Sequence, residues 1–151
     1  MNASYWSERY QSKKTEWDLG KVSSPLVEIF KGIKKNAKIL IPGCGNAYEA
    51  EFLFNIGYKN VHLIDVAKEP LEAFKRRNES FPHDQIILGD FFDHSGLYDF
   101  IIEQTFFCAI QPALRTKYVR KTHQLLKPRG ELLGVLFDRD FEGGPPFGGR
   151  K

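Results

Sequence analysis

The chain has 151 residues, 42% of them hydrophobic and 27% charged, with a formal net charge of +3. This length and composition are typical of one globular domain, and so small a charge gives no argument for nucleic-acid binding. No apolar run reaches the roughly 18 residues that span a bilayer, and the N-terminus lacks the apolar core of a signal peptide. We therefore expect a cytoplasmic protein without membrane attachment.

Short apolar runs alternate with helical patterns between residues 38 and 137. Strands are expected at 38–42, 61–65, 85–90, 99–105 and 131–137, and helices at 47–56, 70–78 and 114–126. This alternation predicts parallel pairing with helices on both faces, which is an α/β fold with a doubly wound, mainly parallel sheet. We expect one domain of 1–151: an N-terminal lid or helical segment (1–37, with a helix near 25–34), the sheet core (38–137), and a Gly/Pro-rich loop (138–151).

The first expected strand ends at Gly43-Cys44-Gly45, and a helical pattern follows at once. Glycines let the chain turn sharply and let a ligand approach the backbone, and ligands of such sheets lie at the carboxyl ends of the strands. The two glycines alone would also fit a tight turn that holds no ligand. Asp65 lies 22 residues after Gly43, at the end of the second expected strand, where a carboxylate can bind a ribose diol. Although Asp65 could also cap a helix, the pair predicts a cofactor that contains a nucleoside.

Tyr48 stands where a dinucleotide fingerprint has its third glycine, which disfavours a pyrophosphate at this turn. S-adenosylmethionine has no phosphate and suits a looser turn, with its methionine end near Gly43 and Gly45. At the end of the third expected strand, Asp90 could accept a hydrogen bond from the adenine amino group and Phe91 could pack on the ring. A plain turn role for Asp90 is the alternative.

Further stretches carry a family resemblance over nearly the whole chain. They read TEWDLGKVSSPL, LIPGCGNA, LIDVA, GDFF, YDFIIEQTFFCAIQPALRTKYV, LLKPRGELL and GGPPF, in this order. With them the chain resembles class I S-adenosylmethionine-dependent methyltransferases, and more narrowly the thiopurine S-methyltransferase family, especially its thiol and halide methyltransferases. The resemblance implies a Rossmann-like fold and S-adenosylmethionine as the cofactor.

The resemblance also implies roles for single residues. Trp6 and Trp17 would close over the cofactor, with Tyr10 in the place of a third aromatic residue. Gly43, Asp65, Asp90 and Phe91 match cofactor-binding positions, whereas Gln104 stands where other members have tyrosine or arginine. Family members continue past GGPPF with a helix and antiparallel strands, so we expect this sequence either to be a part of a longer chain or to be truncated. A true truncation would expose the edge of the sheet and favour a homodimer.

The expected reaction is an in-line transfer of the methyl group to a small soft nucleophile, such as a thiol, sulfide, a halide or a thiopurine-like acceptor. Catalytic residues are not assigned. Gln104, Phe106 and Phe107 are candidate pocket residues, and Trp6 and Tyr10 are further candidates for its walls. Asp99 and Glu103 are interpreted as structural or capping groups, and Cys108 as a small buried residue rather than a nucleophile.

Two alternatives remain, namely an NAD-dependent oxidoreductase and a module that binds the cofactor without catalysis. The four histidines show no metal-ligand spacing, and two cysteines make no disulfide framework, so we expect no metal site. The expected partner is a small methyl acceptor, not a nucleic acid or a membrane.

Overall fold

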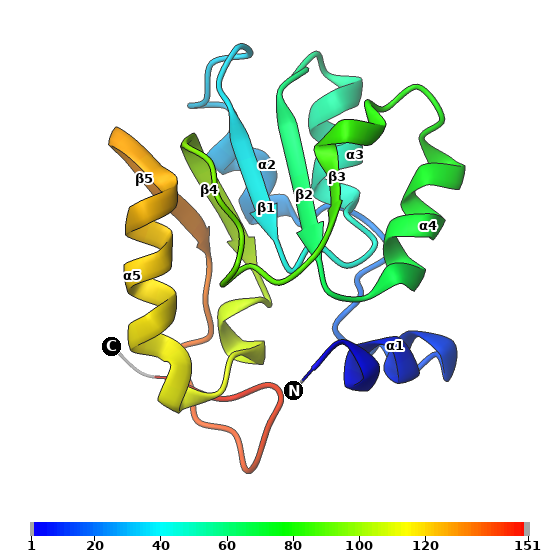
Figure 1. The fold of residues 1–151 in the computed structure, drawn as a ribbon, viewed down its shortest axis with the longest axis vertical. Helices are drawn as coiled ribbons and strands as arrows, with labels where there is room; N and C mark the ends of the chain where they lie inside the picture. Colours follow the sequence, from blue (N-terminus) through cyan, green and yellow to red (C-terminus); the bar gives the residue numbers. More distant parts are fainter. Residues whose placement is uncertain (1, 150–151) are drawn as a thin grey trace.

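The computed structural model describes residues 2–149, in which helices flank a single five-stranded sheet (Figure 1). Its strands are β1 (Ile39–Pro42), β2 (Val61–Asp65), β3 (Ile86–Leu88), β4 (Tyr98–Gln104) and β5 (Leu126–Val135). Its helices are α1 (Ala3–Gln11), α2 (Ser24–Phe30), α3 (Tyr48–Asn55), α4 (Lys68–Arg77) and α5 (Arg115–Leu125). Short 3-10 turns lie at His83–Gln85, Phe107–Ala109 and Pro112–Leu114. Met1, Arg150 and Lys151, the ends of the expected lid and loop, lie outside the described residues.

The strands pair in the order β3-β2-β1-β4-β5, and all four pairings are parallel. The chain therefore leaves β1 in one direction and returns on its other side at β4. In doubly wound sheets this switch in strand order opens a crevice at the carboxyl ends of the strands. The fold class expected from the sequence is confirmed.

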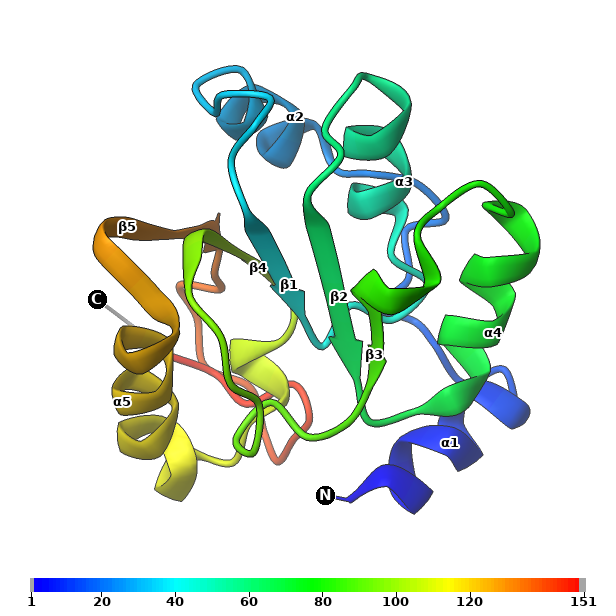
Figure 2. The ribbon, with the colours of Figure 1, turned by 45° about the horizontal axis from the view of Figure 1, so that its top comes forward.

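Successive strand residues point to opposite faces of the sheet, and each face has its own core. Ile39 and Ile41 of β1 belong to a cluster with residues of α2, α3 and α4, whereas Leu40 between them packs with residues of α5. Figure 2 shows α5 on one side of the sheet and α2 and α3 on the other. Both faces of β1 are buried, which explains its uninterrupted apolar sequence.

The fifth strand differs from its expected position. It was expected at 131–137, after a break at Lys127-Pro128-Arg129-Gly130, but β5 starts at Leu126 and ends at Val135. Tyr98 pairs with Leu126 and Phe100 pairs with Glu131, so the residues between them form an irregularity in which Arg129 has φ +67°. Since β5 is an edge strand, a proline at such a bulge removes no ladder hydrogen bond that the sheet needs.

Both terminal segments lie at the carboxyl ends of the strands, where α1 and the loop after β5 can be followed in Figure 1. Helix α1 contributes no buried residue, and it is joined to α4 by a hydrogen bond from Gln11 Nε2 to Glu69 Oε1 (2.7 Å). A core helix would bury an apolar face, so α1 is a cover rather than part of the core. Within residues 2–149, no helix has the length and apolar character that crossing a membrane requires.

Candidate active site

A cavity of about 950 Å³ opens at the carboxyl ends of the strands. Its volume lies within the range of about 300–1,000 Å³ that is typical of small-molecule sites. It brings together nearly all of the site residues expected from the sequence: Trp6, Tyr10, Trp17, Gly43, Asp65, Asp90, Phe91, Gln104, Phe106 and Phe107. Gly45 is the exception, because it does not line this cavity. The described residues contain no group of three or more side chains that could hold a metal ion.

The glycine turn expected from the sequence has a left-handed backbone, with φ +56° at Gly43 and +53° at Gly45. However, aromatic side chains fill the space above both glycines. A Cβ added to Gly43 would lie 2.1 Å from Cδ2 of Phe106, and a Cβ added to Gly45 would lie 2.7 Å from the hydroxyl of Tyr10. The room that we expected a ligand to use is therefore taken by Phe106 and Tyr10 in this structure.

Asp65 connects the glycine turn to the loop after β2. Its Oδ2 accepts a hydrogen bond from Gly45 N (2.9 Å), and its Oδ1 accepts one from Ala67 N (2.9 Å). Asp65 is 8% exposed and lines the cavity, and burial raises its pKa, although the donated N–H bonds act in the opposite direction. Each carboxylate oxygen has lone pairs for a second donor, so Asp65 can hold the turn and still accept hydrogen bonds from a ligand.

Asp90 and Phe91 follow β3 at the cavity wall. Asp90 is exposed and its Oδ1 accepts a hydrogen bond from Phe92 N (2.8 Å), so it forms a turn and still faces the cavity. Phe91 is buried against Phe106, with ring centroids 5.3 Å apart, and against Tyr118 at 5.6 Å. The structure thus places a carboxylate beside a fixed aromatic ring, as the sequence suggested.

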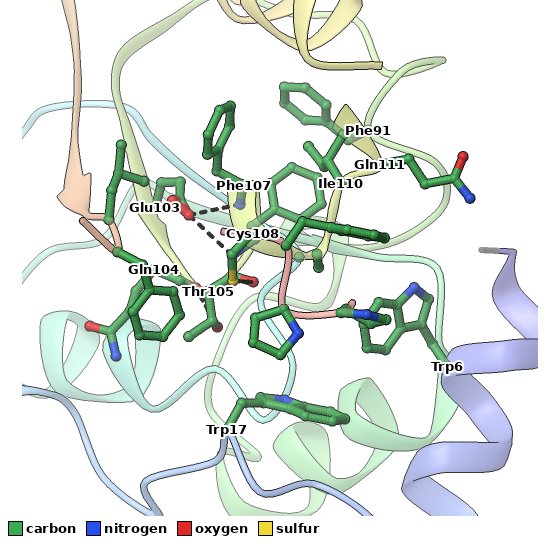
Figure 3. Close-up of a pocket in the computed structure, with 18 of the residues that line it drawn as sticks. Trp6, Trp17, Phe91, Glu103, Gln104, Thr105, Phe107, Cys108, Ile110 and Gln111 are labelled. Carbon is green, nitrogen blue, oxygen red and sulfur yellow. Dashed lines mark hydrogen bonds between the residues drawn. The ribbon is translucent and has the colours of Figure 1, made fainter. Parts of the chain in front are cut away.

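The aromatic residues of the N-terminal segment gather over the cavity mouth, where Figure 3 shows Trp6 and Trp17 facing the open centre. Trp17 makes edge-to-face contacts with Trp6 (5.6 Å) and Tyr10 (5.9 Å), and the Arg9 guanidinium lies 5.3 Å from its ring. Burial raises the pKa of Tyr10, and the nearby charge of Asp65 raises it further, so the phenol stays neutral. From the residues alone, this segment could have been a lid or a helix packed on the core, and α1 has the features of a lid.

The opposite wall follows β4. Gln104 accepts a hydrogen bond from the hydroxyl of Ser23, and Thr105 then adopts φ +63°, which turns the chain into the segment that carries Phe106 and Phe107. Glu103 is 1% exposed, and its Oε1 accepts hydrogen bonds from Phe106 N (3.0 Å) and Phe107 N (2.9 Å), drawn as dashed lines in Figure 3. Burial raises the pKa of Glu103 to about 7. The interpretation of Glu103 as a structural group agrees with these contacts.

Asp99, at the other end of β4, also has the structural contacts that were expected. It accepts hydrogen bonds from Lys38 N (2.8 Å) and Lys127 Nζ (3.2 Å). Both cysteines are buried and free, and burial raises the pKa of Cys108 to about 11 and that of Cys44 well above its usual value. Neither thiol has the low pKa of a nucleophilic cysteine.

Sequence reasoning did not find the contribution of the last loop. Phe141 and Phe147 line the cavity, as does Arg115 at the start of α5. The Arg115 guanidinium stacks on the Phe107 ring (4.6 Å) and donates hydrogen bonds to the carbonyl oxygens of Phe147 and Gly148. Phe147 N also donates to Cys108 O (2.6 Å). The aromatic residues in GGPPF and just before it were the available signal, but the sequence does not show where that loop folds.

Comparison with known proteins agrees with this architecture. The family model described as thiopurine S-methyltransferase matches residues 1–149. The chain is 30% identical to probable thiol methyltransferase 2 of Arabidopsis thaliana and 28% identical to thiocyanate methyltransferase 1 of Brassica oleracea, in each case over 149 residues. These matches cover 94% of this chain and 66% of each relative, so the chain spans about two thirds of the length of these relatives.

Among solved structures, 1,6-didemethyltoxoflavin-N1-methyltransferase of Burkholderia thailandensis superposes with a TM-score of 0.78 at 17% sequence identity. The superposition covers 91% of this chain and 62% of that one. At this identity the likeness shows the fold, which is the Rossmann-like fold of class I methyltransferases. From the match of the family model over residues 1–149, the chain belongs to the thiopurine S-methyltransferase family.

Proposed function

We propose that this chain is an S-adenosylmethionine-dependent methyltransferase that acts on a small soft nucleophile: a thiol, sulfide, a halide or a thiopurine-like compound. One observation carries the proposal: Asp65, Asp90 and Phe91 line the same cavity as the aromatic side chains of the N-terminal lid. Relatives named as thiol, thiocyanate and thiopurine methyltransferases support it. S-adenosylhomocysteine is bound in the similar Burkholderia enzyme, which supports the choice of cofactor.

The residues present fit this cofactor. Asp65 would accept hydrogen bonds from the ribose hydroxyls, because its carboxylate faces the cavity and retains free lone pairs. Asp90 would accept from the adenine amino group, with Phe91 packed beside the ring. Trp6, Tyr10 and Trp17 would cover the cofactor, Gly43 would lie below it beneath the Phe106 ring, and Gln104 would border its inner end. We assign Gly45 the indirect role of fixing Asp65 through its N–H group.

When bound, the cofactor would supply an electrophilic methyl group on a positively charged sulfur. The chain's own contribution is to hold the acceptor in line with that group and to exclude water. The faces of Trp6, Tyr10 and Phe106 can stabilise a nearby cation. Phe107, with Gln104, would form the acceptor side of the cavity, Phe106 would lie between it and the cofactor side, and no residue is assigned as a catalytic base.

We also propose a cytoplasmic location, which the free thiols of Cys44 and Cys108 support. The family assignment gives no support to the oxidoreductase alternative. A measurement of turnover distinguishes the enzyme from a module that binds the cofactor without catalysis.

A methyl-transfer screen tests the proposed activity. The protein would be incubated with methyl-labelled S-adenosylmethionine and, separately, iodide, bisulfide, small thiols, a thiopurine and tellurite. We expect labelled product from at least one of these acceptors. Cofactor binding without product from any of them would favour the inactive module, and failure to bind the cofactor would contradict the proposal as a whole.

A further inference from the structure

Glu103 has a position that neither the fold nor the proposed reaction explains by itself. Its side chain is 1% exposed, and it lies in the wall of the cavity at the end of β4. A buried carboxylate is costly unless its surroundings stabilise the charge. Two backbone N–H groups bind its Oε1, whereas Oε2 is buried without a hydrogen-bond partner among the described residues. Two different roles fit such a group: a base that accepts a proton from the methyl acceptor, or an anchor for the backbone.

The two bound N–H groups belong to residues that shape different parts of the cavity. The Phe106 ring covers Gly43 on the cofactor side. The Phe107 ring lies under the Arg115 guanidinium, which binds the last loop through Phe147 and Gly148. One carboxylate oxygen therefore holds both aromatic walls in place.

The segment that Glu103 holds would not keep this geometry easily on its own. Thr105 has φ +63°, an unfavourable backbone conformation for a β-branched residue, which the surroundings must stabilise. Without Glu103, the N–H groups of Phe106 and Phe107 would lose their acceptor. The unfavourable backbone at Thr105 and the loss of this acceptor would both favour a displacement of the Phe106 and Phe107 rings.

The surroundings of Oε2 favour an anchor over a base. This oxygen is covered, as are the hydroxyl of Tyr118 and Oγ1 of Thr122. Burial raises the pKa of Tyr118, and the charge of Glu103 raises it further. Tyr118 packs on Phe107 (5.3 Å) and Phe106 (6.0 Å), behind the surface that a substrate would touch.

We propose that Glu103 is a positioning residue for methyl transfer, which fixes one wall on the cofactor side and one on the acceptor side through the N–H groups of Phe106 and Phe107. The inference rests on the proposed function, since it assumes that both halves of the cavity are used in one reaction. It requires an acceptor oxygen at this position but no negative charge. A base would instead require an ionisable carboxylate that takes up the proton of the methyl acceptor.

The variants Glu103→Gln and Glu103→Leu separate the two roles. The amide oxygen of Gln can accept from both N–H groups, and its NH₂ group would take the place of Oε2. Leu fills similar space but accepts no hydrogen bond. Asp99→Asn is the matched control, because Asp99 also lies on β4 and also accepts a backbone N–H group, that of Lys38, but lies at the opposite end of the strand, outside the cavity wall.

With a proton-free acceptor such as iodide and with a thiol, we expect E103Q and D99N to retain kcat/KM within a few-fold of the wild type. E103L should lose about 10–100-fold in kcat/KM, the cost of misplacing reacting groups, with a raised acceptor KM. A loss in E103Q comparable to that in E103L, confined to the thiol, would identify a base and overturn the proposal. Unchanged kinetics in E103L would also overturn it. If E103L does not fold, E103Q alone decides between the two roles.

Fluorine NMR of protein labelled with 4-fluorophenylalanine tests the positioning without turnover. The resonances of Phe106 and Phe107, assigned with single Phe→Leu variants, should keep their wild-type shifts in E103Q and D99N and move in E103L. Resonances that stay in place in E103L would contradict the proposal even if the protein were inactive. Conversely, a wild type that does not bind S-adenosylmethionine, but whose rings move in E103L, would overturn only the proposed function.

Discussion

At the scale of single residues, the pKa of Glu103 gives a prediction about stability. In the folded chain burial raises this pKa to about 7, from a usual value of 4.5. Between these two values the folded chain binds more protons than the unfolded chain, so the free energy of unfolding falls as pH rises from about 4.5 through 7. The expected loss is up to about 3 kcal/mol, and it is absent below the unfolded pKa.

Urea unfolding of the wild type and E103Q at pH 5 and pH 8 measures this effect. The wild type should lose about 2.5 kcal/mol more than E103Q between the two pH values, because the amide does not ionise. Cys108 and Tyr118 face the same group but have pKa values raised by burial, so neither ionises in this range. Parallel pH dependence of the two proteins would show that Glu103 does not titrate there.

At the scale of elements, the turn between β1 and α3 depends on the contact between Gly43 and Phe106. Gly43→Ala would introduce a left-handed alanine, at a cost of about 1–2 kcal/mol, and a Cβ that overlaps the Phe106 ring. Gly20→Ala is the control, since Gly20 has φ +68° but no atom within 4 Å of its Cβ position. We expect G43A to destabilise the protein by about 1–3 kcal/mol more than G20A.

The additional destabilisation by G43A relative to G20A should disappear in a Phe106→Ala background, where only the backbone cost at Gly43 remains. A double-mutant cycle on the free energy of unfolding measures this coupling. Equal destabilisation by G43A with and without Phe106 would show that the ring does not rest on the glycine in solution.

The bounds of the strands and the glycine turn show which features of single elements could be predicted from the sequence. The bounds of β2 were predicted correctly, because the run Val61–Asp65 follows the polar Lys59 and Asn60 and ends at an aspartate. The start of β5 was wrong, because Pro128 was read as a break and an edge bulge cannot be recognised from local pattern. The left-handed glycines were predictable from their residue type, whereas the rings that cover them come from α1 and from the segment after β4.

At the scale of the whole molecule, the site is assembled from segments that lie far apart in the chain. The alternating elements predicted a doubly wound parallel sheet, whose strands end at the same edge, and the ends of β1, β2, β3 and β4 meet at the cavity there. The order of the strands was not predicted. The position of the last loop did not follow, because it depends on the contacts of Arg115 with Phe147 and Gly148. Such contacts join two elements that lie far apart in the chain, and the local sequence of either element does not indicate that it contacts the other.

Calorimetric titration with S-adenosylhomocysteine tests the central claim, that this cavity binds S-adenosylmethionine, most directly. The wild type and Asp93→Ala, an exposed carboxylate outside the cavity wall, should bind with equal affinity. Asp65→Ala, checked for folding by its thermal unfolding, should bind at least about tenfold more weakly, because a hydrogen bond to a charged group contributes about 1.5–3 kcal/mol. Absence of binding by the wild type at millimolar ligand, or equal affinity in folded D65A, would contradict the account.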